Sequence, residues 1–286
     1  MKIKRADARG NGPVMDKTFH KKTDKSRKEM PSKPRMPADA REDSGGVVEG
    51  RNAVLELLRS GREIDKVLVA QDVAGHIGGI MKLVRERGVT VVQCDKRKLD
   101  QASITGAHQG IIAYAAAVAY RSMADMLALA HERGEAPLLV LCDGITDPHN
   151  LGAIIRSAEV AGAHGVLIPK RRSAGLNAAC AKAAAGALEH LPVGRVTNLA
   201  AAVDELKESG VWVFGADAGG DMAIYDAPFD GPTAIVIGSE GEGISRLVRE
   251  KCDHIISIPM RGHINSLNAS AAAAVILFEA VRRRMA

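Results

Sequence analysis

Five polar residues stand in three short segments whose other residues are largely apolar or glycine. They are Asn150 and Arg156 in "DPHNLGAIIRSAEVAG", Glu240 in "GSEGEG", and Ser266 and Asn268 in "PMRGHINSLN". A guanidinium can grip a phosphate through two parallel hydrogen bonds and can stabilise a developing oxyanion. A carboxylate or an amide can hold that guanidinium in place. If the three segments meet, they form a site for chemistry on a phosphate-bearing substrate.

Each of these residues also has a structural explanation. Asn150 follows Asp-Pro and Ser266 precedes a helical pattern, so either could cap a helix, and Asn268 could belong to a first helical turn. Arg156 could lay its stem over apolar neighbours and keep its head in water. "GSEGEG" has neither the spacing nor the preceding strand of a dinucleotide-binding loop. Taken singly, the structural explanation is sufficient, but the combination of all five in this order favours a common site.

The elements around the three segments are predicted to bring them together. "PLLVLCDG", "TAIVIGSEGEG" and "HIISIP" contain apolar runs of strand length that lead into the polar segments, and helical patterns such as "LAAAVDELKESG" separate them. This alternation predicts an α/β fold with a mainly parallel sheet and helices on both faces. Ligands of such sheets bind at the carboxyl ends of the strands. We therefore expect the five residues to lie within reach of one another.

A smaller α/β unit precedes this sheet. "VVEGRNAVLELLRSG" and "IGGIMKLVRERG" are typical of helices, and "IDKVLVA", "VTVVQC" and "GIIAYAAAVAY" are typical of strands. "SLNASAAAAVILFEAVRRRMA" predicts a closing helix with Ser266 as its N-cap. The predicted organisation is a tail over residues 1–45, a small domain over 46–119, a linker with one or two helical turns over 120–136, and a second domain over 137–286.

The excess positive charge lies in the tail. Residues 1–44 hold 13 Lys and Arg against 7 Asp and Glu, whereas the rest of the chain holds 26 against 27. The tail has almost no aromatic residues, so it is predicted to be disordered. Either a polyanion-binding arm or a solubilising extension explains it. The chain has only eight aromatic residues, which argues against RNA recognition by an array of stacking rings.

Composition argues against several other classes of protein. No apolar run reaches the ~18 residues of a membrane span, and the charged start "MKIKRADARGNG" is not typical of a secretory signal. The four cysteines are far apart, without a C-x-x-C pair, which argues against a zinc site or a disulfide framework. We predict a cytoplasmic protein with no metal site.

Three segments resemble, in order, the three motifs of the SpoU (TrmH-type) RNA ribose 2′-O-methyltransferases, which belong to the trefoil-knotted SPOUT class. They are "DPHNLGAIIRSAEVAGAHGVLIP", "IVIGSEGEGIS" and "ISIPMRGHINSLNAS". Residues 46 to about 118, from "EGRNAVLELL" to "AHQGIIA", resemble the L30e-like RNA-binding domain of the bacterial 23S rRNA guanosine 2′-O-methyltransferases of the RlmB type. The resemblance covers everything after the tail.

The resemblance implies S-adenosylmethionine-dependent 2′-O-methylation of a guanosine in 23S rRNA. It implies a homodimer with active sites beside the subunit interface and a knot around residues 258–268. The implied catalytic residues are Arg156, Asn150, Glu240, Ser266 and Asn268. The implied cofactor-binding residues are Gly238, Ile258 and Leu267, with Met260 close by. The sequence departs from the family in the alanine of "SLNAS", where relatives often have valine, and in the long basic tail.

Family proposals make Arg156 the general base, but an arginine side chain is not normally deprotonated in proteins. An electrostatic role, with a phosphate oxygen or water taking the proton, is the simpler interpretation. RNA contacts are expected from Arg51, Lys96 and His108 of the small domain, and phosphate contacts from Lys170, Arg171 and Arg172. A solvated surface charge explains each of these residues equally well.

Three other interpretations stay open at this stage. A tRNA ribose methyltransferase is the nearest, although the extra small domain favours rRNA. A non-catalytic RNA-binding or ribosome-assembly protein has no need for all five polar residues. A nucleotide-dependent oxidoreductase is disfavoured because the dinucleotide fingerprint is absent.

Overall fold

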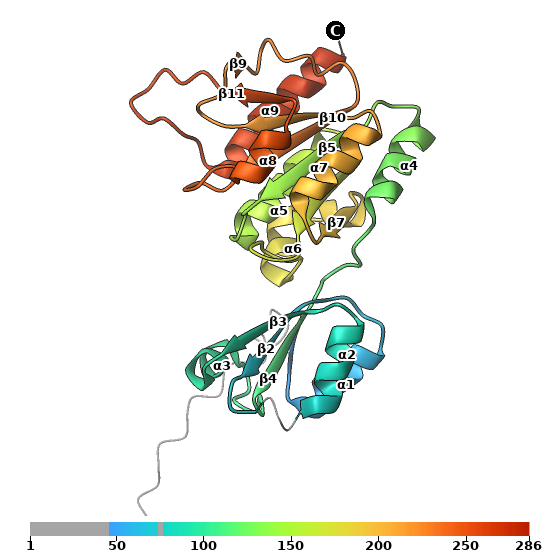
Figure 1. The fold of residues 1–286 in the computed structure, drawn as a ribbon, viewed down its shortest axis with the longest axis vertical. Coiled ribbons are helices and arrows are strands. Elements are labelled where there is room, and N and C mark those ends of the chain that lie inside the picture. The colour runs from blue at the N-terminus through green and yellow to red at the C-terminus, as the bar shows by residue number, and fades with distance from the viewer. Residues whose placement is uncertain (1–45, 74–76, 286) are drawn as a thin grey trace, which may run out of the picture. The chain divides into compact units, whose positions relative to one another are not determined.

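The computed structural model describes residues 46–73 and 77–285, so the predicted tail lies outside the described residues. The first part of the described chain forms a four-stranded sheet with three helices (Figure 1). Its elements are β1 (Val47–Glu49), α1 (Arg51–Arg59), β2 (Ile64–Ala70), α2 (Gly78–Glu86), β3 (Thr90–Cys94), α3 (Lys96–Ala102) and β4 (Ile111–Ala115). The strand order is β1-β4-β2-β3, with β2 and β3 parallel and the other pairs antiparallel.

Alternating side chains of this small sheet enter two cores. Val67 and Val69 of β2 pack with residues of α1 and α2, such as Val54 and Val84. On the other face, Leu68 packs with Leu99 of α3. Successive side chains of a strand point to opposite faces. The sheet is therefore covered on both sides by its own helices.

The second part forms a seven-stranded sheet whose strand pairs are all parallel. The strand order is β7-β6-β5-β10-β8-β11-β9. The strands are β5 (Leu138–Asp143), β6 (Gly165–Pro169), β7 (Val193–Val196), β8 (Trp212–Ala216), β9 (Met222–Ala223), β10 (Thr233–Gly238) and β11 (His254–Ser257). The helices are α4 (Met123–Arg133), α5 (Pro148–Val160), α6 (Ala178–Ala184), α7 (Leu199–Glu208), α8 (Arg246–Lys251) and α9 (Ala269–Arg284).

Helices cover both faces of this sheet, which explains its continuous apolar strands. Val140 and Cys142 of β5 pack in a core with α5, α6 and α9. Leu139 and Leu141 point to the other face and pack with α4, α7 and α8. The prediction of a parallel α/β sheet is confirmed. Within residues 46–73 and 77–285, no helix has the length and apolar character needed to cross a membrane.

Several local predictions were wrong. "VVEGRNAVLELLRSG" is a short strand and a helix, because Gly50 between them has φ 89°, which breaks the helix. The linker contains the 11-residue helix α4, which begins with a capping box of Ser122 and Asp125. Asn268 is the N-cap of α9 in place of Ser266, since its side chain accepts hydrogen bonds from two backbone amides. The short elements α3, α8, β1 and β9 had too few residues for a periodic signal.

The close approach of α5 and α6 depends on Gly152. A Cβ atom at this position would lie 2.5 Å from the carbonyl oxygen of Cys180 and 2.6 Å from the Cβ of Ala183. We predict that Gly152→Ala lowers the free energy of unfolding by about 1–3 kcal/mol, because backbone must shift to admit the methyl group. Gly231→Ala is the matched control, since its methyl group would meet nothing within 4 Å. Chemical denaturation of the full chain measures both, and equal stabilities of the two variants would contradict the packing argument.

Candidate active site

Glu240 joins two other loops at the carboxyl ends of the strands. Asn150 Nδ2 donates a hydrogen bond to Glu240 Oε1 at 2.8 Å. Asn268 Nδ2 donates to the same carboxylate oxygen and, at 2.9 Å, to Asn150 Oδ1. The three segments singled out in the sequence therefore meet at one point, as predicted for loops at one edge of a parallel sheet.

The local sequence explains why both asparagines are available for this contact. Asp147 caps α5 by accepting from the backbone amide of His149 at 2.9 Å, so Asn150 in the first turn is not needed as a cap. Asn268 caps α9 with its Oδ1, which accepts from the amide of Ser270 at 3.0 Å. Its Nδ2 stays free to donate to Glu240, because an asparagine amide carries both an acceptor and donors. An aspartate could cap α9 but could not donate.

Glu240 and Ser266 line a cavity of about 300 Å³ at the ends of β8, β10 and β11. The four residues expected to bind a cofactor lie at the same cavity: Gly238, Ile258, Met260 and Leu267. The walls thus combine glycine backbone with aliphatic side chains. Such a surface suits a flat apolar group whose polar edge bonds to the main chain.

The cavity depends on a tight loop after β10. Ser239 and Gly243 exchange backbone hydrogen bonds of 3.1 and 2.9 Å, which fold "SEGEG" back on itself. A Cβ atom on Gly238 would lie 2.2 Å from the carbonyl carbon of Gly243 and 2.4 Å from the amide nitrogen of Ile244. Only glycine at position 238 allows this loop to close.

Asp217 is a cavity residue that the sequence analysis missed. It follows β8 and lines the cavity, and its Oδ1 accepts from the amide of Gly219 at 2.8 Å. Its Oδ2 lies 2.7 Å from Nη1 of Arg249 in α8. The signal was present, because "GADAGGD" follows a predicted strand and sits at the same sheet edge as the other three loops.

The charges at the cavity have one sign. Asp217, Glu240 and Glu242 line it, and no lysine or arginine among the described residues does. A cavity with aliphatic walls and only acidic charges favours a ligand that combines an apolar ring with a positive charge. Within the same described part of the chain, no group of His, Cys, Asp and Glu side chains is placed to hold a metal ion.

Arg156 does not share this cavity, contrary to the expectation that all five polar residues lie within reach of one another. It lines a separate cavity with Glu159, Val160, His190 and the turn at residues 184–187. The reason is helical geometry, because six residues at 3.6 residues per turn place Arg156 on a different side of α5 from Asn150. The structure therefore brings four of the five together.

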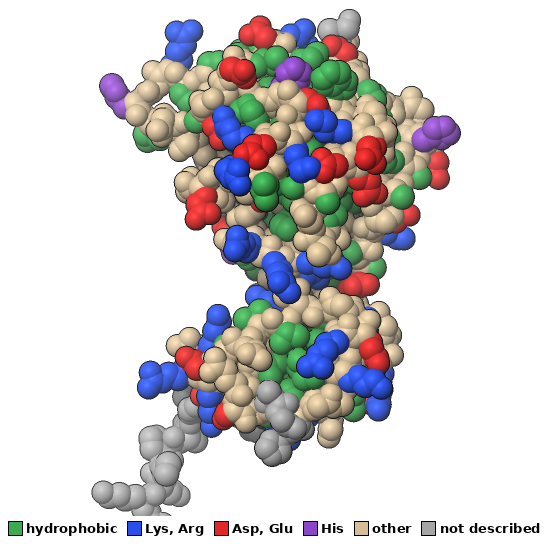
Figure 2. All heavy atoms as spheres, viewed as in Figure 1, with side chains coloured by type: hydrophobic (Ala, Val, Ile, Leu, Met, Phe, Trp, Pro, Cys, Tyr) green, Lys and Arg blue, Asp and Glu red, His purple; other side chains and the backbone are tan. Residues whose placement is uncertain are grey.

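The residues expected to contact RNA lie in two places. Arg51, Lys96 and His108 line one cavity beside the small sheet. Lys170, Arg171 and Arg172 follow β6 and are exposed. These three side chains line a cavity that Pro148, the first residue of α5, also lines. Figure 2 shows the Lys and Arg side chains of one face of the molecule in blue.

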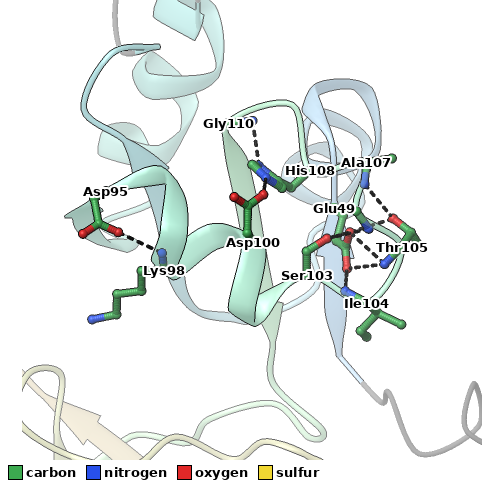
Figure 3. Close-up of polar contacts among 11 residues, drawn as sticks. Glu49, Asp95, Lys98, Asp100, Ser103, Ile104, Thr105, Ala107, His108 and Gly110 are labelled. Carbon is green, nitrogen blue, oxygen red and sulfur yellow. Dashed lines mark hydrogen bonds and ion pairs between the residues drawn. The ribbon is translucent and has the colours of Figure 1, made fainter. Parts of the chain in front are cut away.

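His108 has a structural task that the sequence did not reveal. Its side chain is buried, its Nδ1 accepts from the amide of Gly110 at 3.0 Å, and its Nε2 lies 3.0 Å from Asp100 Oδ1 (Figure 3). Because Nδ1 accepts a hydrogen bond, the ring proton is on Nε2 and is directed at Asp100. The ring therefore fixes the loop after α3 and has no ring nitrogen left for RNA.

Two protein families match the two parts of the chain. Residues 137–278 match the SpoU rRNA Methylase family, and residues 47–121 match the family described as RNA 2′-O ribose methyltransferase substrate binding. The two matches correspond to the two sheets and define the class of protein, which is an RNA methyltransferase.

Similar proteins identify the family. The chain is 46% identical over 238 residues to YacO of Bacillus subtilis, which is assigned to the TrmH family of tRNA/rRNA methyltransferases; the match covers 83% of this chain and 95% of YacO. A TrmH family protein of Staphylococcus haemolyticus is 45% identical over 239 residues, with 83% of this chain and 96% of the relative covered. The chain belongs to the TrmH (SpoU) family of RNA methyltransferases.

Solved structures give the same result for the fold. The SpoU methyltransferase AviRb of Streptomyces viridochromogenes, crystallised with the cofactor AdoMet, is 27% identical with a TM-score of 0.55; the match covers 88% of this chain and 95% of AviRb. A TrmH family protein of Porphyromonas gingivalis is 25% identical with a TM-score of 0.52, and 87% and 94% of the two chains are covered. Neither the knot nor the L30e-like character of the small sheet follows from these matches, so both stay predictions.

The carboxylate of Glu49 forms a clamp on residues 103–105, in the loop that leads to the RNA-binding candidate His108. Glu49 accepts hydrogen bonds from Ser103 Oγ at 2.6 Å, from Thr105 Oγ1 at 2.7 Å and from the amide of Ile104 (Figure 3). Burial alone raises the pKa of Glu49, but these donors outweigh burial and hold the pKa below its usual value of 4.5.

We predict that this clamp weakens in acid. A carboxylate whose pKa is lower in the folded state contributes stability that is complete above the unfolded pKa and is lost as the pH falls through the folded pKa. Hydrogen-exchange protection of the Ile104 and Thr105 amides should therefore fall as the pH is lowered below 4.5. In Glu49→Gln the side chain does not titrate, so this pH dependence should disappear. An identical pH profile in the variant would show that Glu49 does not cause the loss of hydrogen-exchange protection in acid.

Proposed function

We propose that this protein transfers a methyl group from S-adenosylmethionine to a ribose 2′-oxygen of RNA. The observation that carries the proposal is the acid-lined cavity at the carboxyl ends of β8, β10 and β11, tied to Asn150 and Asn268 through Glu240. Membership of an RNA methyltransferase family and a cofactor-bound structural neighbour support it.

The cavity fits the proposed cofactor chemically. When bound, S-adenosylmethionine supplies a methyl group that is already activated by the positive sulfonium. Glu240 and Glu242 provide negative charge for a cationic ligand, whereas Asp217 is already paired with Arg249. Ile258 and Leu267 provide apolar surface for an adenine ring. Gly238 and Gly241 allow the main chain to approach closely.

The remaining tasks are to align the ribose and to stabilise charge on its oxygen as the proton leaves. We assign the charge stabilisation to Arg156, whose planar fork suits a phosphate or a developing alkoxide. Glu240, Asn150 and Asn268 position the loops, and Ser266 faces the cavity where the substrate ribose must enter. A phosphate oxygen or water takes the proton, because arginine remains protonated.

We further propose that Arg156 acts in the cavity of a second copy of the chain. Arg156 lines a cavity of its own, apart from Glu240. The same helix exposes Val160 by 63%, and α9, which packs against α5, exposes Val275 by 41% and Phe278 by 48%. Val160 lines the same cavity as Arg156, and exposed apolar residues on these two packed helices suit a homodimer contact, which would cover them.

The substrate we propose is a guanosine of 23S rRNA, with a tRNA ribose as the nearest alternative. The match of residues 47–121 to a substrate-binding domain supports RNA as the partner. Arg51 and Lys96 are available for RNA contacts there, and Lys170, Arg171 and Arg172 for phosphate contacts beside α5. An RNA substrate and the dispersed cysteines support a cytoplasmic location.

The proposed reaction can be tested with tritiated S-adenosylmethionine, protein-free 23S rRNA and bulk tRNA. We expect label in 23S rRNA, at one guanosine ribose on mapping. Label in tRNA would replace the rRNA proposal with the tRNA alternative. Absence of transfer to either RNA by a protein that binds the cofactor would contradict the proposed function.

The tight loop after β10 leads to a prediction about cofactor affinity. Gly238→Ala should weaken S-adenosylmethionine binding at least about tenfold, because its methyl group collides with backbone and forces the loop open. Gly231→Ala is the matched control, since Gly231 does not line the cavity and its added methyl group meets nothing within 4 Å. Isothermal titration measures both affinities, and similar losses would show that loop closure does not control binding.

The position of Arg156 predicts complementation between inactive subunits. Arg156→Ala should abolish methyl transfer, and Arg156→Lys should not restore it because lysine lacks the fork. Glu240→Ala should also be inactive. If Arg156 acts across the interface, a mixed dimer of Arg156→Ala and Glu240→Ala has one site with both groups, and mixing the two variants restores transfer. No recovery from verified mixed dimers would place Arg156 and Glu240 in the same subunit's site.

A further inference from the structure

The small sheet carries a cavity that the methyl-transfer site does not explain. Its volume is about 590 Å³, and the start of α1, the end of β2, α3 and the loop before β4 line it. This volume is within the range of small-molecule sites. Four charged side chains line the cavity, namely Arg51, Asp72, Lys96 and Asp100.

The walls of this cavity are firmly held. The backbone amide of Arg51 donates to Gln109 Oε1 at 3.1 Å, and Arg51 Nε donates to the Gln109 carbonyl at 3.3 Å. Gln109 has φ 50°, which is uncommon for a residue other than glycine, and His108 fixes the same loop through Asp100 and Gly110 (Figure 3). Unfavourable backbone of this kind persists where the surroundings impose it, and it is frequent at binding sites.

The charges of the cavity are available to a ligand. Among residues 46–73 and 77–285, the structure records no ion pair for Arg51, Lys96 or Asp72, although all three line the same cavity. Arg51 uses Nε for Gln109, which leaves its two terminal nitrogens for an anion. One oxygen of Asp100 is engaged by His108, so Asp72 is the carboxylate with both oxygens free.

A ligand that satisfies these groups needs an anion and, near it, two adjacent hydrogen-bond donors. A phosphate suits Arg51 and Lys96. A carboxylate that accepts two parallel bonds suits guanine, whose N1–H and N2 amino group lie side by side on one edge. The corresponding edges of adenine, cytosine and uracil do not carry two adjacent donors. Unpaired bases of single-stranded RNA expose these edges.

We propose that this cavity binds one unpaired guanosine nucleotide of the RNA substrate, with its phosphate on Arg51 and Lys96 and its base edge on Asp72. This nucleotide is distinct from the one that is methylated. By recognising its base, the cavity would position the RNA substrate. The proposal rests on the proposed function only in taking the ligand to be part of an RNA.

The test titrates the full-length protein with guanosine, inosine, adenosine, cytidine and uridine 5′-monophosphates, followed by protein NMR. Guanosine monophosphate should bind at least about tenfold more tightly than adenosine monophosphate and shift the Gln109 and Gly110 amides. Inosine monophosphate, which lacks the N2 amino group, should bind with intermediate affinity. Equal affinities for the nucleotides, or no binding of guanosine monophosphate, would overturn the proposal.

Variants assign the effect to the cavity. Asp72→Asn should reduce the preference for guanosine to about twofold or less, and Arg51→Gln should weaken binding of all five nucleotides about tenfold. Lys96→Gln should weaken binding of all five nucleotides as Arg51→Gln does. Lys98→Gln is its matched control and should leave binding unchanged, because both side chains are exposed on α3 and only Lys96 lines the cavity. If Asp72→Asn and Arg51→Gln leave the affinity for guanosine monophosphate unchanged, the nucleotide binds elsewhere and the proposal is overturned.

Methyl transfer on the same preparations separates this proposal from the proposed function. Transfer to RNA by a protein that shows no guanosine preference overturns the cavity assignment alone. Guanosine binding at the cavity by a protein that methylates neither rRNA nor tRNA overturns the proposed function alone.

Discussion

One carboxylate oxygen, Oε1 of Glu240, accepts the side-chain amides of Asn150 and Asn268 and so connects loops from three separate parts of the sheet edge. Other local features make this contact possible. Asp147 caps α5 and leaves Asn150 free, and Asn268 caps α9 with one end of its amide while it donates with the other. The cavity walls next to Glu240 are thereby held in one arrangement, and a preformed site loses less free energy when its ligand binds.

Two kinds of charge are separated in the structure. The charged residues that line the cavity are carboxylates, which suits a cationic methyl donor, whereas Arg156 lines another cavity together with the exposed Val160 of α5. An arginine inside the acidic cavity would pair with Glu240 or Glu242 and compete with the donor. In the proposed homodimer, an arginine supplied by the second copy would leave both charges available until the site is assembled. The homodimer is then a requirement of the proposed chemistry.

The sequence predicted much of this fold because long periodic segments and strand-end polar residues carry strong signals. Convergence of Asn150, Glu240 and Asn268 followed from the rule that parallel strands end at one edge. Arg156 was misplaced because the rule was applied to a residue two turns into a helix, where the direction of the side chain depends on helical phase. Ser266 was wrongly taken as a cap because Ser and Asn are equally good caps. The burial of His108 was not visible because its partners, Asp100 and the Gly110 amide, are set by the loop conformation.

Glu240 links the Asn150 loop to the cofactor cavity, and a double-mutant cycle measures whether this link controls cofactor binding. Asn150 does not line the cavity, and its side chain is linked to it by hydrogen bonds with Glu240 and Asn268. We predict that Asn150→Ala weakens the affinity severalfold in the wild-type chain and much less in the Glu240→Ala background, which corresponds to a coupling energy of about 1 kcal/mol. Equal effects of Asn150→Ala in both backgrounds would contradict the account.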